Sequence, residues 1–383
     1  MGIVFDVHAH CFPPLGELQP GESADGMARR LRAHQYHQHT RGGPALSGPE
    51  WGVFRIRDNI QIHEALMLGD ADGESWMPHM DFRIGAFGRT EFTSGGEDYR
   101  IQWLPPTLRD SSVSPDLMIA QMDYAGVDKA LIQHDHLYGH LDDYLAACMK
   151  QYPGRFAALA QVDEWVGGTP EQVERVRHQI EDLGFSGLYF ATEAFFVSDF
   201  SMDLNDRSLE PLWDLVGDLS VPVFWYISNQ VRPQEESYLK EVRDLTAWAR
   251  NHPHIPLALT HGLTDPLDIH PDLAILLQSP NTWMEMFLMS FTLVDDPPSV
   301  SEVVLKLIEE FGAEKLLWGS DMPCAERHLP YKKWVDTIRE ADFLTVDQRD
   351  AILGGNLERL LDRDRPQPQP LGLGAPGRIP TKP

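Results

Sequence analysis

Two histidines stand two residues apart near the start of the chain, in the stretch FDVHAH. Residues 3–7, which are apolar except for Asp6, predict a strand that leads directly into His8 and His10. Side chains two apart on a strand point to the same face, so both imidazoles can reach one metal ion. A chance pair at the end of a strand is the alternative, because the motif is short.

Polar side chains also stand within the last residues of the other predicted strands. They are His134, His136, Asp163, Glu164, Glu193, Tyr226, His261, Glu285 and Asp321. Several have an ordinary alternative explanation. Tyr226 and Glu285 could be hydrogen-bonded core residues. His134 and His136 could be structural or could contact a substrate.

Eight predicted strands position these side chains. After the first strand they run over residues 128–136, 156–164, 185–193, 221–228, 255–262, 281–287 and 315–321. Helical periodicity fills the intervals between them, so the later strands alternate with helices as in βα units. We expect an α/β fold, a (β/α)8 TIM-like barrel. A doubly wound open sheet is the alternative, but no GxGxxG follows the first strand.

The carboxyl ends of parallel barrel strands share one rim, and chemistry in such barrels takes place there. His8, His10, His261 and Asp321 all stand at the ends of predicted strands, so they should meet at this rim. Imidazole and carboxylate are common ligands of divalent metals. The four residues together therefore predict a metal site.

A long segment with weak periodicity separates the first strand from the regular part of the chain. It covers residues 11–112, is rich in Gly, Pro, His and Arg, and is interpreted as an insertion that acts as a lid or an oligomer contact. Residues 1–363 are expected to form a single barrel domain. The tail, residues 364–383, has no core-forming content and should be disordered or a partner-binding arm.

The composition excludes several classes of partner. The net charge of −26 argues against nucleic acid and anionic membranes, which both need a basic footprint. No apolar run approaches the roughly 18 residues of a membrane span, and no signal peptide is evident. Three scattered cysteines (Cys11, Cys148 and Cys324) do not suggest a disulfide framework. We expect a cytoplasmic protein that acts on a small molecule.

These motifs resemble the amidohydrolase superfamily, and more closely the branch that contains aminocarboxymuconate semialdehyde decarboxylase. The similar stretches are DVHAH, YPGRFAALAQVD, GFSGLYF, LEPLWDLVGDLSVPVF, LTHG, LLWGSDMP and ILGGNLERLL. The resemblance covers the first strand and residues 115–361, and leaves out the insertion and the tail.

The resemblance implies a role for each matching residue. His8 and His10 would be metal ligands from the first strand, and Asp321 a ligand from the last strand and the usual proton acceptor. His261 would be a second-metal ligand in a dinuclear enzyme, or an acid/base or substrate-polarising group in a mononuclear one.

The chain departs from the superfamily pattern at the fifth strand. Relatives read like PVFIH there, whereas this chain reads PVFWY and places Tyr226 where a histidine ligand is usual. Glu193 stands where dinuclear members have a bridging carboxylate. If both bind, the site suits two iron ions or a manganese–iron pair. If neither binds, His8, His10 and Asp321 remain, the set typical of non-haem Fe(II) oxygenases. A single zinc or manganese ion is the alternative.

Three functions stay open at the level of sequence. The first is an O2-dependent monooxygenase that hydroxylates a small organic or amino acid at a dinuclear iron or Mn/Fe centre, as in a few superfamily members. The second is a non-oxidative decarboxylase or C–C/C–N hydrolase of a small carboxylic acid, with a divalent metal as Lewis acid. The third is a non-catalytic, metal-binding subunit of a hetero-oligomer.

Substrate contacts are harder to read from the sequence than metal ligands. His134, His136, Arg100 and Trp103 are candidates, with a surface or structural role as the alternative for each. An arginine can bind a substrate carboxylate through paired hydrogen bonds. We expect a homodimer, or a hetero-oligomer with a related subunit, because a long insertion beside an active face often forms subunit contacts.

Overall fold

The computed structural model describes residues 2–37, 53–62, 81–198, 201–227, 235–261, 267–286 and 299–362. Within these ranges no helix combines the length and the hydropathy of a membrane-crossing segment. The predicted disordered tail, residues 364–383, lies outside the described residues.

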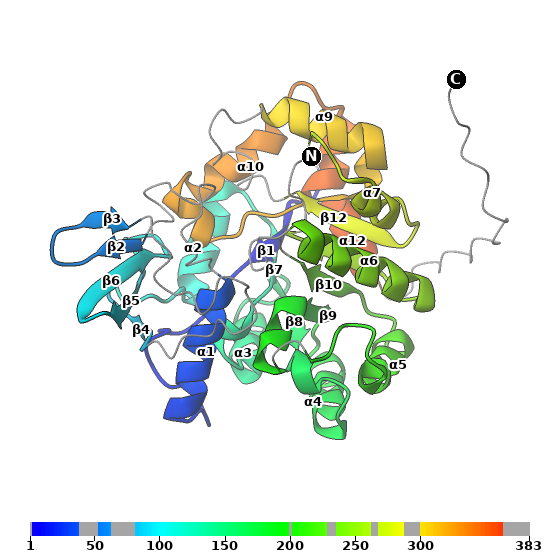
Figure 1. Ribbon diagram of the computed structural model, residues 1–383. Coiled ribbons are helices and arrows are strands. Elements are labelled where there is room, and N and C mark those ends of the chain that lie inside the picture. Colours follow the sequence, from blue (N-terminus) through cyan, green and yellow to red (C-terminus); the bar gives the residue numbers. More distant parts are fainter. Residues whose placement is uncertain are drawn as a thin grey trace, which may run out of the picture.

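Eight parallel strands form the central sheet, and their spatial order is their order along the chain. They are β1 (Phe5–Ala9), β7 (Lys129–Ile132), β8 (Phe156–Gln161), β9 (Gly187–Ala191), β10 (Val223–Tyr226), β11 (Leu257–Thr260), β12 (Thr282–Met286) and β13 (Leu316–Trp318). Each of these eight strands lies where the sequence predicted one (Figure 1).

The first and last strands come together and close the sheet into a barrel. Ala9 pairs with Met322 in a parallel bridge just beyond β13. The amide of Asp321 donates to the carbonyl of His8 at 2.9 Å, and the amide of His10 donates to the carbonyl of Met322 at 2.8 Å. The (β/α)8 barrel prediction is therefore confirmed, and the open-sheet alternative is wrong.

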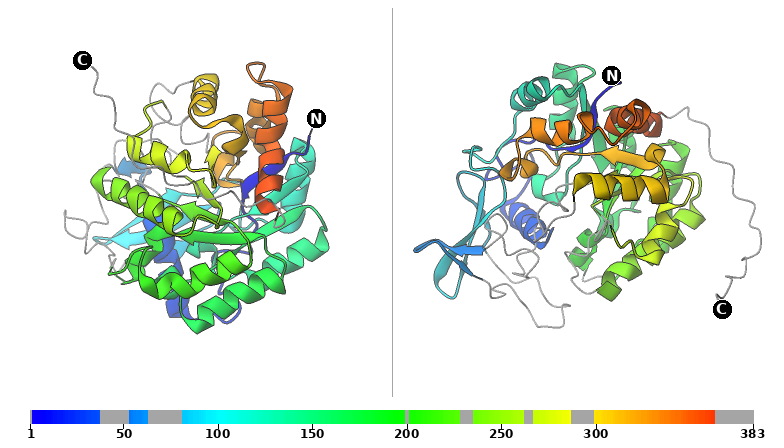
Figure 2. Two further views of the ribbon diagram at one scale, coloured as in Figure 1. Left: turned by 90° about the vertical axis from the view of Figure 1, so that its right-hand side faces the viewer. Right: turned by 90° about the horizontal axis from the view of Figure 1, so that it is seen from above.

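Helices cover the outside of the barrel, as the views in Figures 1 and 2 show. They are α2 (Pro115–Ala125), α3 (Asp142–Gln151), α4 (Pro170–Glu181), α5 (Glu210–Asp218), α6 (Glu235–Asn251), α7 (Pro271–Leu277), α9 (Val300–Phe311), α10 (Tyr331–Arg339), α11 (Val346–Asp350) and α12 (Asn356–Leu361). Their ends follow local chemistry. The α2 helix begins after the N-cap Ser114 and ends at Gly126, whose positive φ of 73° suits glycine.

Two layers of apolar side chains stabilise the barrel. One buried cluster includes Phe5, Val7, Leu159, Phe224 and Leu317, which all come from barrel strands. A larger buried cluster joins the strands to the surrounding helices and to the insertion. Because strands buried on both faces are apolar throughout, a polar side chain at a strand end stands out from its surroundings.

The segment between β1 and α2 contains a second, antiparallel sheet that the sequence interpretation did not predict. Its order is β3 (Ile60–Ile62), β2 (Val53–Arg55), β6 (Glu97–Gln102), β5 (Arg89–Ser94) and β4 (Arg83–Ile84). The sheet projects to one side of the barrel in the right-hand view of Figure 2. Three of the strands have only two or three residues, so their alternation gave a weak signal. The β5 and β6 strands have six residues each, and Gly95 and Gly96, both with positive φ, mark their hairpin turn.

One helix of the same segment lies over the barrel rim. It is α1 (Ala24–His37), and it approaches the short 3₁₀ turn η2 (His136–Tyr138) that follows β7. Arg30 of α1 fastens it there, because its buried guanidinium donates to the carbonyls of Leu15 and Leu137 and pairs with Glu22. The lid or oligomer role predicted for residues 11–112 stays a prediction.

Candidate metal centre

The three candidate ligands come from the two strands that close the barrel. His8 lies within β1 and His10 follows it, while Asp321 comes three residues after β13. All three side chains are buried. Asp321 has a φ of 55°, a left-handed conformation that costs a non-glycine residue free energy and is concentrated at functional sites. The backbone is thus bent so that this carboxylate faces the two histidines.

The donor atoms of these residues form a compact triangle. The Nε2 atoms of His8 and His10 are 3.1 Å apart, and Oδ1 of Asp321 lies 3.0 Å from Nε2 of His10 and 3.7 Å from Nε2 of His8. Ligands about 2.1 Å from a shared tetrahedral ion would be about 3.4 Å from each other. The triangle therefore fits a divalent cation, and two imidazoles with one carboxylate suit zinc, manganese or ferrous iron.

Each histidine is oriented by a hydrogen bond from its other ring nitrogen. Nδ1 of His8 donates to Oε1 of Glu285 at 2.8 Å, and Nδ1 of His10 donates to the carbonyl of Gln133 at 2.6 Å. A carbonyl and a carboxylate only accept hydrogen bonds, so the Nδ1 atoms carry the protons. Both Nε2 atoms are left to face the centre, as metal-binding histidines require.

Electrostatics in the cluster favour an anionic Asp321. Burial alone would raise the pKa of Asp321, but the hydrogen bond from His10 and the neighbouring charge of His8 lower it. Burial would also lower the pKa of His8, but Glu285, Asp321 and Asp6 together raise it to about 9. The buried carboxylates thus surround the histidines with negative charge that would complement a cation.

The carboxylate of Asp6 links β1 to the residues that follow β13. Asp6, fully buried, accepts hydrogen bonds from the Ser320 hydroxyl at 2.6 Å and the Tyr331 hydroxyl at 2.8 Å. It also accepts from the amide of His8 at 3.0 Å. Gly319 leaves the space that this arrangement needs, since a Cβ there would lie 2.4 Å from Oε1 of Glu285. The sequence WGSD is thus shaped by close packing around His8.

Two of the remaining predicted ligands, His261 and Tyr226, form a row of rings that starts at His8. The His261 ring lies 4.8 Å from the His8 ring, and the Tyr226 ring lies 5.0 Å from the His261 ring, between centroids. Among the described His, Cys, Asp and Glu residues, only His8, His10 and Asp321 bring three donor atoms within 4.8 Å of one another. His261 also has a left-handed φ, of 57°. Ligand roles for His261, Tyr226 and Glu193 stay predictions.

His134 and Trp103, two of the predicted substrate contacts, lie near the cluster. His134 follows β7 and is buried, and within the described residues neither of its ring nitrogens has a hydrogen-bond partner. Burial lowers the pKa of His134 to about 3, so the imidazole is neutral. Trp103 packs against Tyr138 with ring centroids 5.8 Å apart, and Tyr138 stacks on His10 at 4.8 Å.

The other two predicted substrate contacts lie elsewhere. The Nε2 atom of His136 lies 2.6 Å from Oε2 of Glu164, within hydrogen-bond distance. Arg100 lies in the insertion sheet, where it donates to Asn59 at 2.6 Å and its guanidinium lies 4.7 Å from the centre of the Phe54 ring. No contact in the described part of the chain joins Arg100 to the metal triangle, and its substrate role stays a prediction.

Two contributors to the site were missed by reasoning from the sequence. Glu285 was interpreted only as a polar residue on strand seven, although the structure shows that it orients His8. Tyr138 was not singled out, although its ring covers His10. A carboxylate within an apolar strand, as in TWMEM, is the signal for Glu285. No comparable signal marks Tyr138.

Comparison with known proteins agrees with this architecture. The profile of the family described as Amidohydrolase matches residues 5–363. No curated protein sequence matches the chain significantly.

Solved structures show the same fold at low sequence identity. An uncharacterised TIM-barrel protein from Bordetella bronchiseptica is 16% identical, with a TM-score of 0.53 over 94% of this chain and 98% of that one. A probable 2-pyrone-4,6-dicarboxylic acid hydrolase from Acinetobacter baumannii is 17% identical, with a TM-score of 0.50 over 66% of this chain and 90% of that one. At these identities the likeness concerns the fold alone.

Proposed function

The chain belongs to the amidohydrolase family, and on that premise we propose that it cleaves a small carboxylic acid without O2, by decarboxylation or hydrolysis at one divalent metal. The observation that carries the proposal is the triangle of His8, His10 and Asp321, which offers one ion three protein ligands. The hydrolase from Acinetobacter baumannii, named for a dicarboxylic acid, agrees with this class of reaction.

The metal and the protein residues have separate tasks in this proposal. A bound divalent ion supplies Lewis-acid polarisation of a substrate carbonyl or carboxylate. His8, His10 and Asp321 would hold it, with Glu285 keeping His8 in the required orientation. Burial of the three ligands limits competing water and strengthens electrostatic interactions with the substrate.

Residues in and around the triangle would transfer the protons. Decarboxylation replaces a carboxylate by a proton and releases CO2, so an acid must deliver a proton to carbon. Hydrolysis needs a base to take a proton from water and an acid to protonate the leaving group. Asp321 is suited to accept a proton because it is anionic, and His261, beside His8, is suited to deliver one.

His134 is proposed as a substrate contact. Its neutral imidazole has one donor and one acceptor, and within the described residues neither is used. An unpaired buried polar group costs about 1–3 kcal/mol, a cost that a hydrogen bond to substrate would offset. The change His134→Phe keeps a planar ring and removes both polar atoms. It should raise KM and leave the bound metal unchanged.

Metal analysis combined with anaerobic assays tests the reaction class. The purified chain should contain about one zinc or manganese ion. It should convert members of a panel of small aromatic and aliphatic carboxylic acids under nitrogen, with release of CO2 or of hydrolysis products. Asp321→Ala is the matched negative control. Turnover that requires O2 and a reductant would overturn the proposal.

An O2-dependent monooxygenase with two iron ions, or a Mn/Fe pair, is the second candidate. The observation in its favour is the position of Tyr226, whose ring lies 5.0 Å from that of His261 at the same rim. A tyrosinate bound to ferric iron would give a visible absorption band that Tyr226→Phe abolishes. Neither the family nor the two structures named above is described as an oxygenase. The predicted homodimer or hetero-oligomer stays a prediction for either candidate.

A further inference from the structure

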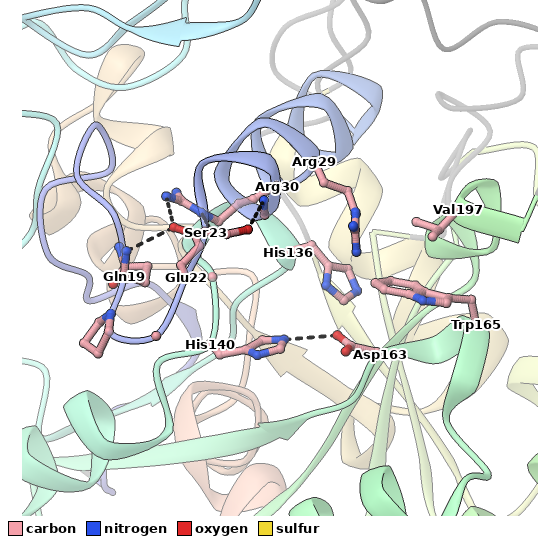
Figure 3. Close-up of a pocket in the computed structure, with 14 residues that line it drawn as sticks. Gln19, Glu22, Ser23, Arg29, Arg30, His136, His140, Asp163, Trp165 and Val197 are labelled. Atoms are coloured by element: carbon pink, nitrogen blue, oxygen red, sulfur yellow. Dashed lines mark hydrogen bonds and ion pairs between the residues drawn. The ribbon is translucent and has the colours of Figure 1, made fainter.

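A cavity of about 340 Å³ lies at the barrel rim, apart from the three candidate metal ligands. One wall comes from α1 and the loop before it, and the other from residues that follow β7 and β8. None of His8, His10 and Asp321 lines it. Figure 3 shows Arg29 of α1 extending into this cavity toward His136 and Trp165.

The charged side chains around the cavity are paired, with one exception. Arg30 binds Glu22 at 2.8 Å, His140 lies 3.0 Å from Asp163, and His136 lies 2.6 Å from Glu164. Arg29 makes no hydrogen bond or ion pair with any residue in the described ranges.

Arg29 and Arg30 are neighbours in the sequence, but their guanidinium groups differ in burial and in hydrogen bonding. Arg30 is buried, and its guanidinium is used up by carbonyl groups and Glu22, so it holds α1 in place. Arg29 is exposed to the cavity, and its five donors are available to a ligand. In a chain of net charge −26, an unpaired arginine inside a polar cavity is a local site for an anion.

Two side chains near Arg29, those of Trp165 and His136, indicate which class of anion the cavity would bind. Trp165 presents an indole beside the His136 ring, with centroids 5.2 Å apart. Burial would lower the pKa of His136, but the Glu164 carboxylate raises it to about 9, so this ring is a cation at neutral pH. A planar apolar surface and positive charge thus lie together, and both are suited to a flat ring that carries a negative group.

We propose that this cavity binds a planar organic carboxylate. Its carboxylate would accept paired hydrogen bonds from the Arg29 guanidinium, and its ring or conjugated chain would pack against Trp165. The fork of a guanidinium matches the two oxygens of a carboxylate, which makes this pairing stronger than a contact with a neutral group. The inference goes beyond the proposed reaction, since it needs neither turnover nor the identity of the metal.

Calorimetric titration with benzoate tests the proposal directly. The full-length, metal-loaded protein should bind benzoate, and benzamide, which has the same shape without the charge, should bind at least tenfold more weakly. Arg29→Gln should weaken benzoate binding by about tenfold or more, the range for a lost charge-assisted hydrogen bond. Arg32→Gln is the matched control, because it removes the same charge from the same helix and Arg32 does not line the cavity.

Two further variants separate this cavity from the metal site. Asp321→Ala should leave benzoate binding within about twofold of the wild type, because Asp321 does not line the cavity. Trp165→Leu should weaken benzoate more than it weakens acetate, which has no ring to stack. Circular dichroism before each titration confirms that the variants are folded.

Three results would overturn the proposal. The first is equal benzoate affinity in Arg29→Gln, Arg32→Gln and the wild type. The second is loss of binding in Asp321→Ala alone, which would place benzoate at the metal. The third is tight binding of inorganic phosphate without binding of benzoate, which would assign the cavity to a different anion.

Discussion

The metal triangle and the Arg29 cavity occupy the same rim of the barrel but are built in different ways. The triangle comes from β1 and the segment after β13, which are joined by backbone hydrogen bonds where the barrel closes. The cavity owes one wall to α1, a helix of the insertion that the Arg30 side chain fastens to the segment after β7. The triangle is buried and supported by backbone hydrogen bonds, whereas the cavity is partly open.

This difference indicates that the geometry of the triangle is rigid and that the lining of the cavity can vary. Buried ligands with oriented ring nitrogens keep their geometry because any displacement would leave polar groups unpaired. A cavity under an inserted helix can change its lining without disturbing the barrel. We therefore expect the two sites to fail independently when they are mutated.

The largest effect is expected for Asp321→Ala. Removing the carboxylate takes one of three ligands from the triangle and leaves the histidines without their anionic neighbour. Bound metal should fall from about one ion per chain to a trace after dialysis, and activity should fall by more than 100-fold, beyond the usual effect of residues that only orient ligands. Elemental analysis measures the metal. Unchanged metal content would show that the triangle is not the binding site.

His136→Gln should affect stability in a manner that depends on pH. The pKa of His136 is raised from 6.5 to about 9, with burial opposing and Glu164 producing the increase, and Asp163 and Asp135 adding to it. A raised pKa means that the ion pair stabilises the fold fully below about pH 6.5, and that this contribution is lost as pH rises through about 9. The upper limit is about 3 kcal/mol.

Urea unfolding at pH 6 and pH 10 checks this pH dependence. The gap between wild type and His136→Gln should be wide at pH 6 and close at pH 10. His178→Gln, at an exposed pair with Asp182, is the control and should change the free energy of unfolding by well under 1 kcal/mol. Metal content should stay constant in His136→Gln. A loss of metal would show that the two sites are not independent.

Glu285→Gln should weaken the metal site without removing a ligand. Glutamine can still contact Nδ1 of His8, but it lacks the charge that fixes the tautomer and increases the basicity of the ring. The dissociation constant of the metal should rise by about 10–100-fold, measured by competition with a chelator. Glu309→Gln, on the exposed face of α9, should have no effect. Equal affinities in both variants would contradict the orienting role of Glu285.

Arg30→Gln should loosen α1 and affect the cavity more than the triangle. The change removes hydrogen bonds to the carbonyls of Leu15 and Leu137 and the pair with Glu22. We expect the free energy of unfolding to fall by about 2 kcal/mol, whereas Arg32→Gln should stay within about 0.5 kcal/mol of the wild type. Denaturant unfolding measures both. A drop in metal content in Arg30→Gln would show that α1 also supports the triangle.

Much of the barrel and the core of the site could be read from the sequence. Alternating apolar strands and amphipathic helices are local signals, so the eight strands were predicted close to their observed positions. His8 and His10 are two residues apart, and their common direction follows from the geometry of a strand. Asp321 could be added because all barrel strands end at one rim.

Other features depended on distances that no local pattern encodes. Tyr226 and Glu193 stand at strand ends as His8, His10 and Asp321 do. Only the tertiary structure shows that, among the described His, Cys, Asp and Glu residues, His8, His10 and Asp321 are the ones that form the compact triangle. Three strands of the insertion sheet, β2, β3 and β4, have only two or three residues and carry little periodicity, whereas the longer β5–β6 hairpin was missed although its Gly-Gly turn marks it.

What the sequence alone determined is the set of candidate ligand types and the barrel that gathers them, because strand alternation and the common rim are properties of the backbone. Tertiary structure decided which groups touch. Glu285 reaches His8 across 277 positions of the chain, and Arg29 faces Trp165 because Arg30 anchors its helix. Such contacts result from how elements pack against one another, and packing depends on the whole fold rather than on any segment of it.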